Sequence, residues 1–230
     1  MKYLRLFETN DDEIVSICRN YHIKRFFINS DRSINVSGDV DLSRFKIDKL
    51  PLKFDYVSGG FHCNVNNLET LEGSPWKLGG DFNCQSNKLV NLHKGPKEVG
   101  NNFVCSYNKL LTLEGGPYQV GKNYDCSYNS LSNLKGCVKR VPGFFICMNN
   151  RLISTEGAPT IVNGSLKLDD IALPHTFKNS VKNLLKNKLI YKMDIYKLIL
   201  KYQNDYSIWI GDKLDKNRFF EMMQEIEREF

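Results

Sequence analysis

The sequence predicts an α/β repeat solenoid, in which short parallel β coils stack between a helical cap at each end. Residues recur every 21 positions, a period-two alternation accompanies each recurrence, and proline and glycine fill the rest of the unit. The columns are aromatic (Phe61, Phe82, Phe103, Tyr124, Phe145), cysteine (Cys63, Cys84, Cys105, Cys126, Cys147), asparagine (Asn66, Asn87, Asn108, Asn129, Asn150), leucine (Leu68, Leu89, Leu110, Leu131, Leu152; Leu71, Leu92, Leu113, Leu134, then Thr155) and a closing aliphatic (Leu78, Val99, Val120, Val141, Val162).

Each unit predicts one short strand followed by extended or tight-turn chain. In Phe103-x-Cys105 the alternation directs both side chains to one face of a strand. A unit of 21 residues is too short for a long crossover helix, and its proline and glycine indicate turns. Stacked strands then form a parallel sheet over one continuous core. We expect this solenoid over residues 33–173. The best repeats lie at 61–165, and degenerate repeats begin near Val40 and Leu166.

The asparagine column has a structural explanation. Backbone groups lose their sheet partners where the chain leaves each strand and turns inward. A buried amide side chain both donates and accepts, so it can satisfy these groups in coil after coil. We therefore expect five structural asparagines and assign them no catalytic role.

The columns resemble the leucine-rich-repeat family, whose core pattern is Leu-x-Leu-x-x-Asn-x-Leu. The pattern here is Phe103-x-Cys105-x-x-Asn108-x-Leu110, and it is similar to a Cys-containing variant found in uncharacterised proteins of tailed bacteriophages and bacteria. The resemblance covers roughly residues 20–170. It implies a leucine-rich-repeat-like coil in a phage-encoded binding protein, with inhibition of a host defence or regulatory factor as an expected role.

The flanking segments predict helices. Residues 1–32 read as a helical cap, with Asn10 or Asp11 capping a helix that runs to about Asn20. Residues 174–230 lose the cysteine and asparagine pattern and gain lysine and long apolar side chains. We expect helices there near 176–188, 193–203 and 216–228, packed as a C-terminal cap or small module on the last coil.

Composition predicts an ordinary globular protein of the cytoplasm. The hydrophobic share is 41%, the charged share is 25% and the net charge is +6, which is mildly basic. The opening residues do not resemble a signal peptide, and no stretch approaches the roughly 18 apolar residues of a membrane span. We therefore expect reduced thiols and no membrane association.

The sequence contains no constellation typical of an enzyme, a metal site or a cofactor site. The column cysteines occur once per unit and point inward, whereas zinc ligands must surround a point. The histidines (His22, His62, His93, His175) show neither metal nor triad spacing. We expect buried structural thiols and a non-enzymatic protein with no catalytic residue, cofactor or metal.

The outward strand positions form the candidate site. They change from polar in the early coils to apolar at Phe144, Ile146 and Met148, with two tyrosines in a neighbouring column. An exposed apolar patch indicates an interface with a protein partner. The alternative is that the C-terminal helices fold over the patch and bury it. The candidate contacts are Tyr107, Tyr128, Phe144, Ile146, Met148, His62, Asn83 and Asp125.

A second functional hypothesis uses the lysine-rich C-terminal segment. Lysines at helical spacing could bind the phosphates of a nucleic acid, and such binding would weaken steeply with added salt. A solvated helix face is the ordinary explanation for the same pattern. The candidate basic patch is Lys178, Lys182, Lys186 and Lys192.

Overall fold

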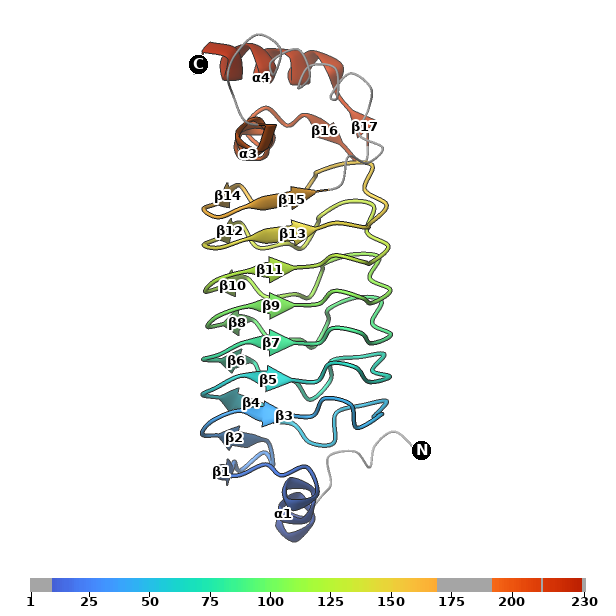
Figure 1. The fold of residues 1–230 in the computed structure, drawn as a ribbon, viewed down its shortest axis with the longest axis vertical. Helices are drawn as coiled ribbons and strands as arrows, with labels where there is room; N and C mark the ends of the chain where they lie inside the picture. The colour runs from blue at the N-terminus through green and yellow to red at the C-terminus, as the bar shows by residue number, and fades with distance from the viewer. Residues whose placement is uncertain (1–9, 169–191, 212, 229–230) are drawn as a thin grey trace.

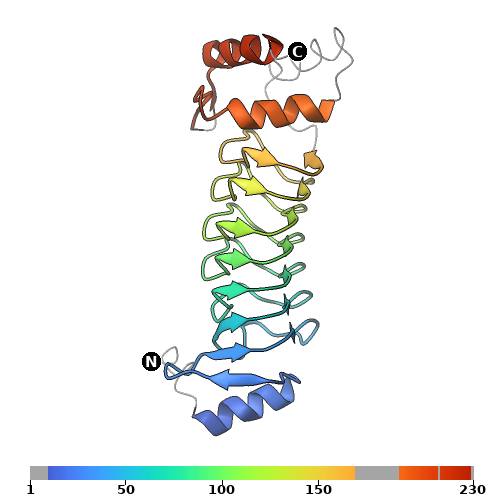
Figure 2. The ribbon, with the colours of Figure 1, turned by 90° about the vertical axis from the view of Figure 1, so that its left-hand side faces the viewer.

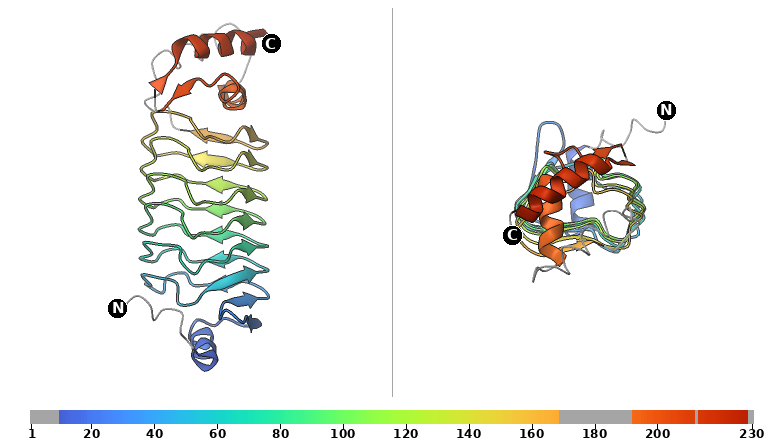
Figure 3. Two further views of the ribbon diagram at one scale, coloured as in Figure 1. Left: turned by 180° about the vertical axis from the view of Figure 1, so that it is seen from behind. Right: turned by 90° about the horizontal axis from the view of Figure 1, so that it is seen from above.

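The computed structural model describes residues 10–168, 192–211 and 213–228, which form a straight column of stacked coils with helices at both ends (Figure 1). The column shows no horseshoe curvature from the side (Figure 2). Seen from above, the coils superimpose in one outline (Figure 3). The described helices are α1 (Asp11–Asn20), α3 (Lys192–Tyr202) and α4 (Lys216–Arg228).

One face of the column is a seven-stranded parallel sheet with one strand from each coil. Each strand begins 21 residues after the previous one, and all neighbours pair in register, from Val40 opposite Phe61 to Phe145 opposite Leu166. The predicted parallel coil is therefore confirmed, including the degenerate repeats that begin near Val40 and Leu166. The strands are β3 (Val40–Asp41), β5 (Phe61–His62), β7 (Phe82–Asn83), β9 (Phe103–Val104), β11 (Tyr124–Asp125), β13 (Phe145–Cys147) and β15 (Leu166–Leu168).

A second sheet lies behind the first. Its six-stranded part is parallel except for the antiparallel pair β1–β2, and a further parallel pair, β12–β14, lies in the last coils. The sequence predicted only extended or turn chain here, because two-residue strands give no recognisable alternation. The strands are β1 (Phe26–Ile28), β2 (Ile34–Val36), β4 (Phe54–Val57), β6 (Lys77–Leu78), β8 (Glu98–Val99), β10 (Gln119–Val120), β12 (Arg140–Val141) and β14 (Ile161–Val162).

The core between the two sheets is built from the repeated columns. The aromatic, cysteine, leucine and closing aliphatic side chains are all buried in one continuous cluster. The rings of Phe61, Phe82 and Phe103 stack with interplanar angles of 8° and centroids 5.6–5.8 Å apart. Tyr124 departs from this order: its ring is tilted by 44° from that of Phe103, and its buried hydroxyl has no hydrogen-bond partner among the described residues.

The asparagine column joins consecutive coils, as the sequence predicted. Asn87 donates from Nδ2 to the carbonyls of Cys63 and Cys84, both at 3.0 Å, and accepts from the amide of Leu68 at 2.9 Å. All five asparagines repeat this geometry, donating to the carbonyl 24 residues earlier and accepting from the amide 19 residues earlier. Each amide thus satisfies backbone groups that the sheet leaves unpaired.

Helices α1, α3 and α4 begin and end near their predicted positions. Asn10 caps α1, accepting from the amide of Glu13 at 2.8 Å, and Ile14 and Cys18 belong to the solenoid core. In α3, Leu200 belongs to the solenoid core while Ile199 packs in a separate cluster with α4. A hairpin of β16 (Trp209–Ile210) and β17 (Lys213–Leu214) joins α3 to α4. The predicted helix at 176–188 lies outside the described residues.

A buried polar contact joins α3's C-terminal end to the last repeats. Thr155 breaks the second leucine column, and its hydroxyl donates to the side-chain oxygen of Gln203 at 2.7 Å. The same oxygen accepts from the indole of Trp209 at 3.1 Å. Both Thr155 and Gln203 are buried, so the departure from leucine is explained by the segment that packs against this coil.

Replacement of one ladder asparagine tests the role of the amides. Asn87→Ala leaves two carbonyls and one amide without this partner, so we expect the free energy of unfolding to fall by about 3 kcal/mol. Denaturant unfolding measures it. Asn204→Ala, at an exposed position, is the control and should change stability by less than about 0.5 kcal/mol. Equal losses in both variants would contradict the ladder's role.

Removal of the unpaired hydroxyl of Tyr124 should stabilise the protein. Tyr124→Phe restores the aromatic column and removes a buried polar atom, so we expect a gain of about 1 kcal/mol in thermal or denaturant unfolding. Tyr56→Phe removes a hydroxyl from an exposed ring and should be close to neutral. A loss of stability in Tyr124→Phe would mean that the hydroxyl has a favourable partner.

Candidate functional site

The outward side chains of the seven-stranded sheet form one ladder across the coils. The in-register positions are Asp41, His62, Asn83, Val104, Asp125, Ile146 and Lys167. The predicted contacts His62 and Asn83 are therefore direct neighbours, as are Asp125 and Ile146. All four side chains are half-buried, so part of each is accessible on the outer face of the sheet.

Two of these predicted contacts have structural roles in their own coils. The side-chain oxygen of Asn83 accepts from the amide of Gln85 at 3.0 Å, and that of Asp125 accepts from the amide of Ser127 at 2.9 Å. Asp41 makes the same contact with Ser43. Such side-chain turns stabilise the chain where it leaves a strand. Asn83 and Asp125 are thus partly occupied within the solenoid.

Tyr107 and Tyr128 stack on each other at the edge of this face. Their ring centroids are 4.2 Å apart with an interplanar angle of 10°, and each side chain is about half exposed. They occupy a column of left-handed residues directly before the ladder asparagines, with φ of 55° and 54°. A hydrogen bond with Tyr128, aided by desolvation, raises the pKa of Tyr107 above its ordinary value.

A second polar ladder, which sequence reasoning missed, follows the corner before each strand of this sheet. The side-chain oxygen of Asp81 accepts from the amide of Asn102 at 2.9 Å, that of Asn102 from Asn123 at 3.2 Å, and that of Asn123 from Phe144 at 2.7 Å. The signal in the sequence was an Asp or Asn every 21 residues before the aromatic column.

Phe144 ends this corner ladder with an apolar side chain. A methyl group added at Gly164 would stand 2.6 Å from the Phe144 ring, so the ring lies over that glycine. Phe144 nevertheless remains 48% exposed. No hydrogen bond explains an exposed aromatic ring at a position that Asp81, Asn102 and Asn123 occupy in the preceding coils.

The same coil is apolar at the other outward positions. Ile146 occupies the strand ladder, and Met148 is 37% exposed where Ser106 and Ser127 of the preceding coils are buried. Tyr128 donates its backbone amide to the carbonyl of Met148 at 2.8 Å, so the tyrosine stack adjoins this coil. We call Tyr107, Tyr128, Phe144, Ile146 and Met148 the apolar patch.

The described C-terminal elements leave the apolar patch exposed. Helix α3 contacts β14 and β15, one coil beyond the patch. Phe144 and Met148 stay exposed beside the described C-terminal residues. The exposed fractions therefore favour a patch that α3 and α4 leave open, while the third predicted helix, at 176–188, lies outside the described residues.

The predicted basic patch is largely outside the described residues. Lys178, Lys182 and Lys186 belong to the segment 169–191, which the structure does not describe. Lys192 is the first residue of α3, where only the backbone is described. The described residues therefore do not place the side chains of these four lysines.

The column cysteines are buried free thiols. Burial raises the pKa of Cys84 to about 12 and raises the pKa of Cys63, Cys105 and Cys126 well above the ordinary value. A thiol with a raised pKa is a poor nucleophile, since the thiolate is the reactive form. Among the described residues, no three His, Cys, Asp or Glu side chains gather in a group that could hold a metal ion.

Comparison with models of protein families, with curated proteins and with solved structures finds no match. In the described part of the chain, no helix has the length and apolar content needed to cross a bilayer.

The buried thiols predict a loss of stability in alkali. An unfolded thiol ionises near pH 9, while folded Cys84 keeps its proton to about 12. The unfolded state therefore binds fewer protons above pH 9, and the free energy of unfolding falls as pH rises through this window. In Cys84→Ala we expect this fall to be shallower by about 1.4 kcal/mol per pH unit. Denaturant unfolding at several pH values measures the slope, and an unchanged slope would contradict the burial of this thiol.

Proposed function

We propose that the chain is a non-enzymatic binding scaffold whose apolar patch docks onto a protein partner. The observation that carries the proposal is the replacement of polar by apolar side chains at three outward positions of one coil, Phe144, Ile146 and Met148. The equivalent positions of earlier coils are mostly polar and several serve hydrogen-bond ladders. Apolar and aromatic side chains gathered on a polar face are typical of the centre of a protein interface.

The geometry of the patch supports the same proposal. The stacked rings of Tyr107 and Tyr128 are held by their contact with each other, so little side-chain entropy remains to be lost on binding. Phe144 is held over Gly164 by the same kind of close contact. Tyrosine is among the residue types that dominate binding energy at interfaces, and aromatic residues and methionine are enriched there.

The proposal extends to the kind of repeat and its setting. The asparagine ladder and the phenylalanine–cysteine columns support a leucine-rich-repeat type of coil, with α1 at one end and α3 with α4 at the other acting as caps. By its resemblance to Cys-containing repeat proteins of tailed bacteriophages, we propose a phage-encoded protein of the host cytoplasm. Inhibition of a host defence or regulatory protein is the role this resemblance suggests.

A pair of matched substitutions tests the patch. Ile146→Asn and Val104→Asn change the same ladder position to the residue that Asn83 already shows there. Tagged full-length variants would be used to capture proteins from host lysate treated with nuclease. We expect Ile146→Asn to weaken capture of a stoichiometric partner by about tenfold or more, and Val104→Asn to retain it within about twofold.

The result that would overturn the proposal is a partner captured equally by both variants. Capture that disappears after nuclease treatment would overturn it in favour of the nucleic-acid hypothesis. Circular dichroism and thermal unfolding of each variant establish that the coil is intact. A loss of binding with an unchanged melting temperature is then an effect at the face and not on folding.

A further inference from the structure

We infer that the partner presents an acidic surface in which apolar side chains stand among carboxylates. This inference rests on the proposed function and names the chemistry of the partner at the same patch. The observation behind it is the set of charged side chains that surround the patch.

The basic charge of the solenoid is concentrated in the coils that carry most of the patch. Residues 40–117 contain 9 Lys and Arg against 8 Asp and Glu, whereas residues 118–168, the described part of the later coils, contain 6 against 2 and are followed in the sequence by Asp169 and Asp170. Of the two carboxylates in the second stretch, Glu156 pairs with Lys135 at 3.0 Å. Asp125 is turned toward its own strand end, where it accepts hydrogen bonds from Ser127. The basic side chains of these coils therefore exceed the local carboxylates that could neutralise them.

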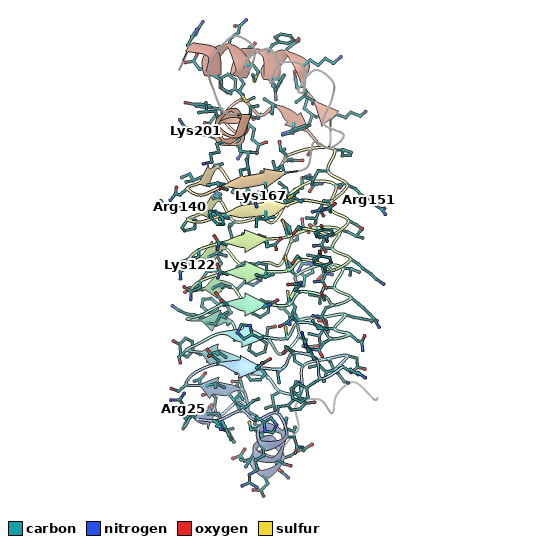
Figure 4. The ribbon with its side chains drawn as sticks, viewed as in Figure 1. Arg25, Lys122, Arg140, Arg151, Lys167 and Lys201 are labelled. Atoms are coloured by element: carbon teal, nitrogen blue, oxygen red, sulfur yellow. The ribbon has the colours of Figure 1, made fainter. Side chains whose placement is uncertain are left out.

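These cations lie around the patch on the same part of the column. Lys167 is the outward neighbour of Ile146, one strand further along the sheet. Lys122 lies at the corner one coil before Phe144, with its carbonyl accepting from Gly143 at 2.9 Å. Arg151 follows Met148 by three residues at the opposite edge. Figure 4 shows Lys167 over the strand face, Lys122 and Arg140 at one edge and Arg151 at the other.

The cations are available to a partner. Lys122, Arg140, Arg151 and Lys167 are exposed, and none forms an ion pair with any described residue. The cations of the early coils are divided: Lys53 and Lys77 are paired with Asp31 and Glu98, whereas Lys88 is exposed and forms no ion pair with a described residue. A rim of unpaired cations around an apolar centre raises the association rate and selects for a partner of opposite charge.

The apolar centre favours a protein over a nucleic acid. Phe144, Ile146 and Met148 offer no hydrogen-bond donor to a phosphate, and they occupy the middle of the charged rim. Phosphate backbones are bound by rows of donors and cations that follow the strand. Carboxylates placed around aliphatic or aromatic side chains match both the rim and the centre.

Peptide selection on the intact protein tests the inference. Random peptides are selected on the immobilised full-length chain and then screened against Ile146→Asn, with Val104→Asn as the control. We expect the peptides whose binding depends on Ile146 to contain aromatic or aliphatic residues and more Asp and Glu than Lys and Arg. Their affinity should fall as salt is added.

Charge reversal provides the second measurement. Fluorescence anisotropy of a selected peptide would be compared for Arg151→Glu/Lys167→Glu and Lys46→Glu/Lys88→Glu, which change the net charge equally. Lys46 and Lys88 are exposed and occupy the repeat position of Arg151 in coils that carry no patch residue. We expect about a tenfold loss of affinity for the first pair and less than about twofold for the second.

The outcomes separate this inference from the proposed function. Peptides that depend on Ile146 but are neutral or basic overturn the acidic partner and leave the protein-binding face standing. A selection without any peptide that depends on Ile146 contradicts the proposed function itself. Single- and double-stranded oligonucleotides serve as competitors. Displacement of the peptide by an oligonucleotide of the same net charge as the peptide overturns the inference in favour of nucleic acid.

Discussion

The fold depends on the hydrogen bonds of the buried asparagine amides. At the end of each strand the backbone turns inward, and its carbonyl and amide groups leave the sheet without partners. Each asparagine donates to one coil and accepts from the same neighbouring coil, so the amide fixes both the turn and the spacing between coils. Since an unsatisfied buried backbone group costs more than a single hydrogen bond contributes, the same residue is required at the same place in every unit. The repeat length is therefore constant from coil to coil, because an insertion in one coil would misalign its amide from the next.

The ladders also explain which surface is free to vary. The inward columns are restricted by packing, and Asp81, Asn102 and Asn123 are restricted by the second ladder at the corner. Ile146 and Met148 belong neither to the inward columns nor to the corner ladder. Phe144 occupies a corner-ladder position, but its side chain cannot accept a hydrogen bond. These apolar side chains keep part of their surface in solvent, with exposed fractions of 48% for Phe144 and 37% for Met148. Exposed apolar surface is unfavourable in water, so a partner that covers these side chains would gain free energy. The buried cysteines offer no such surface, and their raised pKa values show that the thiols stay protonated within the core.

The C-terminal end shows how a repeat pattern can be broken for a structural reason. Thr155 replaces a leucine and donates to Gln203, which also accepts from Trp209. Leu200 of α3 completes the solenoid core while Ile199 packs with α4, so one helix is shared between two clusters. The break at Thr155 and the break at Phe144 look alike in the sequence. One is buried against the following segment and the other is exposed, which separates a folding role from a candidate binding role.

The sequence by itself determined the coil length, the inward columns, the parallel sheet, the structural asparagines and the bounds of α1, α3 and α4, because these follow from spacing that repeats along the chain. It also named the apolar patch. The tertiary structure alone decided the second sheet, the corner ladder, the burial of Ser106 and Ser127 beside an exposed Met148, and the contact between Thr155 and Gln203. Spacing predicts which side of a strand a residue faces, but exposure depends on what packs there from other coils. Thr155 and Gln203 are 48 residues apart, and no local pattern specifies that such distant surfaces meet.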